Sequence, residues 1–282
     1  MNIWFDELKE KLTESEIKKG DIVYISSDLT MLMYRSLKKF NLKGKDGKNL
    51  FMNKLVNTFQ DMVGDEGTLM IPLFTWTFCR GIPFDVAKTH GEVGVLGNWV
   101  LENRPDFART AHPLYSFCVW GKDKDKLVSM QNSTAWGQDS PFAYMHKNNA
   151  KNLLINVSLE KCFTFTHYVE ECIHVPYRYF KDFKGTYIDA CGNETERIYK
   201  MYVRDLDIES KQVTPDKCLD EAKVATVVEF DGNEFRIVDL EKAYPVIVDN
   251  YKNHNGNQWY EFKNYTIDWT SGQTHPDEFR YE

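Results

Sequence analysis

The segment "FTFTHYVEE", residues 163–171, carries side chains suited to acid–base chemistry. His167 precedes Glu170 by three residues and Glu171 by four, and His174 follows one turn later. On a helix these positions share one face. A carboxylate beside an imidazole fixes its tautomer and stabilises the imidazolium, and imidazole titrates near neutral pH. The spacing is therefore compatible with a general base, His167, oriented by Glu170.

Two other interpretations of this segment stay open from spacing alone. A solvated polar face would explain adjacent glutamates without any function, because surface helices commonly carry such faces. A metal site could use His167, Glu171 and His174, but this spacing is not a strong ligand pattern, and no further ligand cluster is evident. We therefore expect no metal. The roles of Glu171 and His174 stay open. They could support the pair of His167 and Glu170, or they could belong to a solvated part of the same helix face.

Other polar side chains lie at the ends of predicted buried strands. "ISSD" ends such a strand with Ser26 and Ser27, and ligands of α/β proteins bind beyond the carboxyl ends of strands. The same residues could instead cap a helix. "TAHPLYS" places His112 before Pro113, a pair that is also common in turns. The chain has no Gly-rich phosphate loop and no Gly-x-Ser-x-Gly elbow.

The composition excludes several classes of protein. The chain has 282 residues and a net charge of −7, so it does not resemble a nucleic-acid binder, which is usually basic. No apolar run approaches the roughly 20 residues of a membrane span. The opening residues lack the apolar core of a secretory signal, and the six cysteines form no compact pattern. We expect a cytoplasmic protein with reduced thiols.

The elements that must position these residues alternate between strands and helices. "IVYIS", a helix over 50–63 that ends at Gly64, and "TLMIPLFT" predict a strand–helix–strand unit and a substantially parallel sheet. Ser140 and Pro141 are typical of a helix N-terminus. Downstream, alternating segments predict hairpins around Gly192–Asn193 and around Asp231–Gly232.

We therefore expect one α/β domain with a mixed, largely parallel central sheet flanked by helices. Its core would extend over residues 1–177, followed by a smaller strand-rich region at 178–263 and a polar tail at 264–282. Neither an internal repeat nor a low-complexity linker divides the chain.

Five separated segments, taken in order, resemble one family. They are "KKGDIVYISSDL", "VGDEGTLMIPLFTWTF", "RTAHPLYSFCVWG", "WGQDSPF", and "NLLINV" followed by "TFTHYVEE". Together they are similar to the motifs of the aminoglycoside 3-N-acetyltransferases and their sugar-acetylating relatives. The resemblance covers residues 15–178 well and the remainder loosely. It implies an antibiotic N-acetyltransferase-like fold and an acyl-CoA-dependent N-acyltransferase, with acetyl-CoA as the expected co-substrate.

The resemblance also implies roles by position. His167 matches the catalytic histidine of the family, and Glu170 matches its partner carboxylate. His112, in the family's His-Pro element beside the cofactor and the active site, is the third candidate catalytic residue. Residues that fall beside the cofactor are Ser26, Ser27, Phe74, Thr75, Thr110 and Ser116. Direct transfer in a ternary complex would follow, with donors near Ser27 or Thr75 stabilising the oxyanion.

Two departures from the family pattern bear on the acceptor. Ser26 occupies the position where the family usually has histidine, and "IHVPYRYFKDFKGTY" is aromatic and basic. The basic side chains there and nearby are suited to phosphates: Arg178, Lys181, Lys184 and Arg197. We therefore favour an amino sugar, possibly nucleotide-linked and destined for surface polysaccharide.

The alternative acceptor is an aminoglycoside antibiotic, acetylated in resistance. A metal-dependent hydrolase or a non-catalytic relative that binds CoA or sugar is more distant from the pattern. The expected partners are an amino-sugar substrate and acyl-CoA, with no nucleic acid and no membrane; a homo-oligomer is compatible with the sequence.

Overall fold

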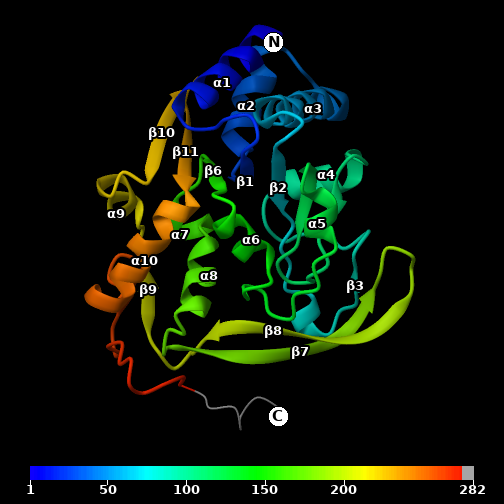
Figure 1. The fold of residues 1–282 in the computed structure, drawn as a ribbon. Coiled ribbons are helices and arrows are strands. Elements are labelled where there is room, and N and C mark those ends of the chain that lie inside the picture. The colour runs from blue at the N-terminus through cyan, green and yellow to red at the C-terminus, as the bar shows by residue number, and fades with distance from the viewer. Residues whose placement is uncertain (275–282) are drawn as a thin grey trace.

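The structure is a computed structural model and describes residues 1–274 (Figure 1). Of the polar tail expected at 264–282, residues 275–282 lie outside the described part. No helix among the described residues is long and apolar enough to cross a bilayer.

A seven-stranded mixed sheet forms the centre of the molecule. Its strands, in spatial order, are β10 (Ala225–Phe230), β11 (Asn233–Asp239), β6 (Lys151–Ile155), β1 (Ile22–Ser27), β2 (Thr68–Pro72), β5 (Phe117–Gly121) and β4 (Ala108–Arg109). This confirms the mixed α/β class. The parallel part is smaller than expected, because only β6, β1 and β2 run parallel to one another, and the other neighbours pair antiparallel.

Residues of the central strands alternate between two separate cores, as the period of a strand requires. In β1, Val23 and Ile25 pack with one core, and Ile22 and Tyr24 pack with the other. The first core is covered by α1 (Asn2–Ser15), α2 (Thr30–Lys39), α3 (Gly44–Val63) and α4 (Leu96–Asn103). Since both faces are covered, β1 and β2 are buried at almost every position.

The second core lies under the short helices of the middle of the chain and under the last helix. These helices are η1 (Phe78–Arg80), α5 (Lys124–Val128), α6 (Pro141–Lys147), α7 (Leu159–Cys162), α8 (Phe165–Cys172), α9 (Asp216–Glu221) and α10 (Leu240–His254). Helix α10 packs against α6 and α8. This contact brings the C-terminal part of the chain next to the segment that carries His167.

Two long strands, β7 (Arg178–Ile188) and β8 (Glu194–Arg204), form a hairpin that lies at the bottom of Figure 1, opposite α1 and α3. The short strand β3 (Phe84–Asp85) pairs with β7. A second small pair joins β9 (Ser210–Gln212) and β12 (Tyr260–Phe262). By contrast, β11 pairs with β10 on one side and with β6 on the other. These two strands of the downstream region therefore belong to the central sheet.

The predicted helix ends are confirmed where local chemistry sets them. Gly64 ends α3 with φ 67°, a conformation that glycine adopts without a Cβ penalty. Ser140 caps α6 by accepting a hydrogen bond from the amide of Ala143, and Pro141 occupies the first turn.

Candidate active site

Glu170, on α8, is the centre of a buried hydrogen-bond network. Its Oε2 lies 2.6 Å from His167 Nδ1 and 2.9 Å from Arg178 Nη2. Its Oε1 accepts from the hydroxyls of Tyr177 at 2.5 Å and Tyr251 at 2.9 Å. The Glu170 side chain is fully buried. Both carboxylate oxygens are therefore paired, as a buried charge requires.

These partners decide the charge of Glu170. Burial alone would raise the pKa of its carboxyl, but the Arg178 charge and the contacts with His167 and Tyr177 outweigh burial and lower the pKa to about 2. Glu170 is therefore a carboxylate at neutral pH. Arg178, which is itself buried, is the ionic partner that holds it in that state.

His167 is oriented by this carboxylate. Arg178 Nη2 lies 3.1 Å from His167 Nδ1, but the contact of this nitrogen with Glu170 Oε2 is shorter, at 2.6 Å. Because an ionised carboxylate only accepts hydrogen bonds, we assign the proton to Nδ1. The Nε2 lone pair is then available to accept a proton. Burial and the nearby Arg178 charge lower the pKa of His167, against the opposing effect of Glu170, so the neutral imidazole prevails at neutral pH.

A cavity of about 300 Å³ adjoins His167, whose side chain remains 24% exposed. Aromatic side chains form much of its wall. The rest of its lining is aliphatic or polar. The lining residues are Phe74, Trp76, Val93, Tyr115, Leu159, Glu160, Lys161, Phe163, Thr164, Thr166, His167, Gln212, Val213, Trp259 and Tyr260. We call this space the aromatic cavity.

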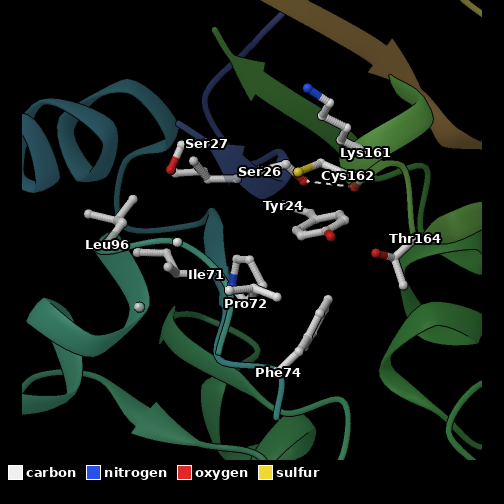
Figure 2. Close-up of a pocket in the computed structure, with 14 residues that line it drawn as sticks. Tyr24, Ser26, Ser27, Ile71, Pro72, Phe74, Leu96, Lys161, Cys162 and Thr164 are labelled. Atoms are coloured by element: carbon white, nitrogen blue, oxygen red, sulfur yellow. Dashed lines mark hydrogen bonds between the residues drawn. The ribbon is translucent and has the colours of Figure 1, made fainter. Parts of the chain in front are cut away.

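A smaller cavity of about 70 Å³ adjoins the aromatic cavity, with which it shares Phe74, Val93, Lys161 and Thr164. Figure 2 shows its opposite walls, with Ser26 and Ser27 on one side and Phe74 and Thr164 around the other. It lies at the carboxyl ends of β1 and β2 and reaches Leu96 and Gly97 at the start of α4. We call it the strand-end cavity.

The structure brings three of the sequence-predicted cofactor residues to the strand-end cavity. Ser26, Ser27 and Phe74 line it. The Ser26 hydroxyl is buried and fixed, since it donates to the carbonyl of Cys162 at 3.4 Å and accepts from Asn152 at 3.2 Å. Ser27 is more exposed.

The other predicted cofactor residues lie behind the cavity walls. Thr75 contacts Thr77 and donates to Glu92, both at 3.1 Å. Thr110 accepts from the amide of Phe117, and Ser116 donates to the carbonyl of Leu73 at 3.0 Å. All three predicted residues are buried. Thr75 and Ser116 support the segment that presents Phe74, and none of the three lines either cavity.

His112 also lies in the interior. Its Nδ1 accepts from the amides of Leu114 at 3.3 Å and Tyr115 at 3.4 Å, and its ring packs against Tyr199 with centroids 4.9 Å apart. Burial lowers the pKa of His112 to about 3, so the ring is neutral. Its contacts shape the turn that presents Tyr115 to the aromatic cavity. The ring itself does not line that cavity.

Glu171 and His174, whose roles the spacing left open, have different environments in the structure. Glu171 is buried, and its Oε1 accepts from Thr134 at 2.8 Å. Thr134 belongs to the same loop as Trp136, whose ring lies 5.1 Å from the His167 ring, so Glu171 fastens the loop that supports the base. His174 is exposed. Within residues 1–274 no group of three His, Cys, Asp or Glu side chains could hold a metal ion.

The basic side chains expected to meet phosphates are directed elsewhere. The guanidinium of Arg178 forms an ion pair with the Glu170 carboxylate. Arg197 stacks on Tyr187, with its guanidinium carbon 3.9 Å from the ring centroid, and Lys181 lies over Phe183. Lys184 is exposed on the hairpin. None of the four lines the aromatic or the strand-end cavity. The phosphate interpretation therefore loses its basis at this site.

Sequence reasoning missed the residues that complete the network. Arg178 follows Glu170 by eight positions in the sequence. This spacing is not a pattern that predicts its contact with His167. Tyr251 is 81 residues away from Glu170. Only the packing of α10 on α8 brings it there.

The comparisons with known proteins identify the family and the fold of the chain. The sequence profile of a family described as aminoglycoside 3-N-acetyltransferase matches residues 35–252. No curated protein matches the chain by sequence at a significant level.

Several solved structures share the fold. The aminoglycoside acetyltransferase AAC(3)-Xa has a TM-score of 0.68 and 17% identity, covering 86% of this chain and 90% of its own. AAC-IIIb, solved as a binary complex with CoASH, has a TM-score of 0.69 and 15% identity, covering 88% and 96%. AAC-VIa bound to sisomicin has a TM-score of 0.67 and 16% identity, covering 89% and 97%. At these identities the likeness supports the fold alone.

Proposed function

Because the chain belongs to the aminoglycoside 3-N-acetyltransferase family, we propose that His167 is the base with which it transfers an acetyl group to the amine of an amino-sugar acceptor. The chain is an acyl-CoA-dependent N-acetyltransferase, and acetyl-CoA is its co-substrate. The identity of the base, the donor and acceptor sites, and the acceptor are the proposed parts.

One observation carries the assignment of the base. His167 Nδ1 is held at 2.6 Å by a fully buried carboxylate, and the same imidazole lines the aromatic cavity. An oriented, neutral imidazole at the wall of a cavity is the arrangement that general-base catalysis needs. Glu170 acts as a positioning residue, because it touches the base and not the cavity.

The adjoining cavities suit two substrates that must meet. We assign the strand-end cavity to the thioester end of acetyl-CoA, since ligands of α/β folds bind beyond the carboxyl ends of strands. We assign the aromatic cavity to the acceptor. The shared residues Phe74 and Thr164 then mark the place where amine and thioester come together.

In the transfer, the acceptor nitrogen attacks the carbonyl carbon of the thioester. His167 Nε2 takes one proton from the nitrogen, the new C–N bond forms, and the C–S bond breaks to release CoA as the thiolate. The proton held by His167 can pass to that thiolate. We assign the hydroxyl of Thr164, which lines both cavities, as the donor to the oxyanion. Holding both substrates in contact supplies much of the rate.

The acceptor proposed here differs from the one favoured on sequence grounds. The nucleotide-linked amino sugar rested on basic residues that do not line the site, whereas the family match favours the alternative, an aminoglycoside. A relative of the same fold is solved with sisomicin. We therefore propose an acceptor whose reactive amine is carried on an amino-sugar ring and which needs no linked nucleotide.

The test is release of CoA thiol from acetyl-CoA with and without amino-sugar acceptors, together with the mass of the product. Acceptor-dependent thiol release and a product heavier by one acetyl group would support the proposal. If acceptors produce neither, while the protein binds CoA, the proposed transfer is wrong.

A further inference from the structure

Three aromatic side chains that line the aromatic cavity use their polar atoms within the protein. Trp76 Nε1 donates to the Tyr115 hydroxyl at 3.3 Å, and Trp259 Nε1 donates to Thr166 at 2.9 Å. The Tyr260 hydroxyl accepts from Arg178 at 3.3 Å. Because these groups already have partners, the rings offer an incoming ligand mainly their faces and edges.

The charged groups of the cavity are few. Glu160 is the one carboxylate among its lining residues, and Lys161 is the one lysine. Figure 2 shows the Lys161 side chain extending away from the rings of Tyr24 and Phe74. Together with exposed Gln212, Lys161 belongs to the solvent-facing part of the lining. His167, as the base, is neutral when it accepts its proton.

This balance limits the charge that the acceptor can carry. An ammonium that leaves water must find a counter-charge, a carbonyl or the face of a ring. One carboxylate and several ring faces can satisfy one ammonium, but a drug with many ammonium groups would leave most of them without a carboxylate partner. The volume, about 300 Å³, is at the lower end of the roughly 300–1,000 Å³ typical of ligand sites.

We propose that the acceptor is a glycoside with a single amino group, attached to an apolar or aromatic aglycone that packs against Trp76 and Trp259. This inference rests on the proposed transfer and narrows its substrate class. The lone amine is presented to His167, and the aglycone lies against the ring faces of Trp76 and Trp259. Sites built from rings gain most of their affinity from such apolar contact.

The experiment compares kcat/KM for three acceptors with acetyl-CoA: a phenyl glycoside of a monoamino sugar, its methyl glycoside, and sisomicin. We expect the phenyl glycoside to exceed the methyl glycoside by about tenfold or more, since burying a ring contributes on the order of 1–3 kcal/mol. Both monoamines should exceed sisomicin.

Two variants connect the preference to the cavity. Trp76→Ala should bring the phenyl-to-methyl ratio close to one, whereas Trp120→Ala, at a partly exposed tryptophan of β5 outside the cavity, should leave the ratio unchanged. Gln212→Glu adds a second carboxylate to the lining at an exposed position, so it should raise kcat/KM for sisomicin relative to the monoamines.

The outcomes separate the two proposals. If sisomicin equals or exceeds the monoamines, or the methyl glycoside equals the phenyl glycoside, this inference is overturned while the acetyl transfer stands. If no amine causes thiol release, the proposed function fails and the inference falls with it.

Discussion

Glu170 and Arg178 form a buried ion pair, with Oε2 and Nη2 2.9 Å apart and side-chain exposures of 0% and 6%. The same carboxylate oxygen holds His167 Nδ1. The Glu170 carboxylate thus joins α8 to the start of β7 and contacts the proposed base.

Removing one partner of this ion pair should lower the stability of the fold. Arg178→Met leaves the Glu170 charge buried with two tyrosines and an imidazole, and we expect it to lower the free energy of unfolding by about 3–5 kcal/mol. The double variant Glu170→Gln/Arg178→Met should lose less than the sum of the single variants, because neither charge is left alone. Urea unfolding in a double-mutant cycle measures this. Additive losses would show that the two side chains do not interact.

His167→Ala and His167→Gln should lower kcat by roughly 10²–10⁴-fold, the range for loss of a general base. CoA affinity, measured by calorimetry, should change little, since His167 does not line the strand-end cavity. The control is His174→Asn. His174 is exposed with φ 50°, a conformation that asparagine tolerates, so its kcat should be unchanged. Near-normal kcat in a folded His167 variant would exclude the assignment.

The hydroxyls of Tyr177 and Tyr251 should matter for acid stability. Glu170 has its pKa lowered to about 2 from 4.5, so its contribution to stability is present above pH 4.5 and is lost as pH falls toward 2. Tyr251→Phe removes one donor to the carboxylate, at a cost of roughly 1.5–3 kcal/mol at neutral pH. Acid unfolding of this variant should begin at higher pH than in the wild type. Unchanged acid unfolding, followed by circular dichroism, would contradict this role.

The Glu171 carboxyl should change stability with pH in the opposite direction from Glu170. Burial raises its pKa to about 7 from 4.5, so the folded state favours its protonated form. The contribution of Glu171 to the free energy of unfolding is complete below pH 4.5 and is lost as pH rises through about 7. The total change in this free energy is on the order of 3 kcal/mol. Glu171→Gln keeps an acceptor for Thr134 without the charge. Relative to wild type it should gain stability between pH 5 and 8.

The control for this profile is Glu194→Gln, at an exposed position of the hairpin. Thermal melts at several pH values compare the three proteins. If the difference between wild type and Glu171→Gln does not change with pH, the carboxyl does not titrate as expected.

The sequence predicted the elements whose signals are local. The cap at Ser140, the end of α3 at Gly64 and the helix that carries His167 and Glu170 each depend on a few adjacent residues. The extent of parallel pairing was overestimated. Neither the antiparallel insertion of β11 beside β6 nor that of β5 beside β2 has a signal in the strands themselves.

The site was predicted only where residues are close in sequence. Spacing suggested that His167 and Glu170 share a face, and the structure places them in contact. Arg178 was interpreted as a phosphate ligand because its charge is visible in the sequence and its burial is not. The aromatic wall had no pattern at all, since Trp76 and Trp259 come from segments far apart in the chain.

The contact between Tyr251 and Glu170 has a consequence for the order of folding. It joins residues 81 positions apart, and closing so long a loop is slow compared with forming α8 itself. The carboxylate that orients the base obtains its full set of partners only after the last helix docks. During refolding, catalytic activity should therefore return later than helical content.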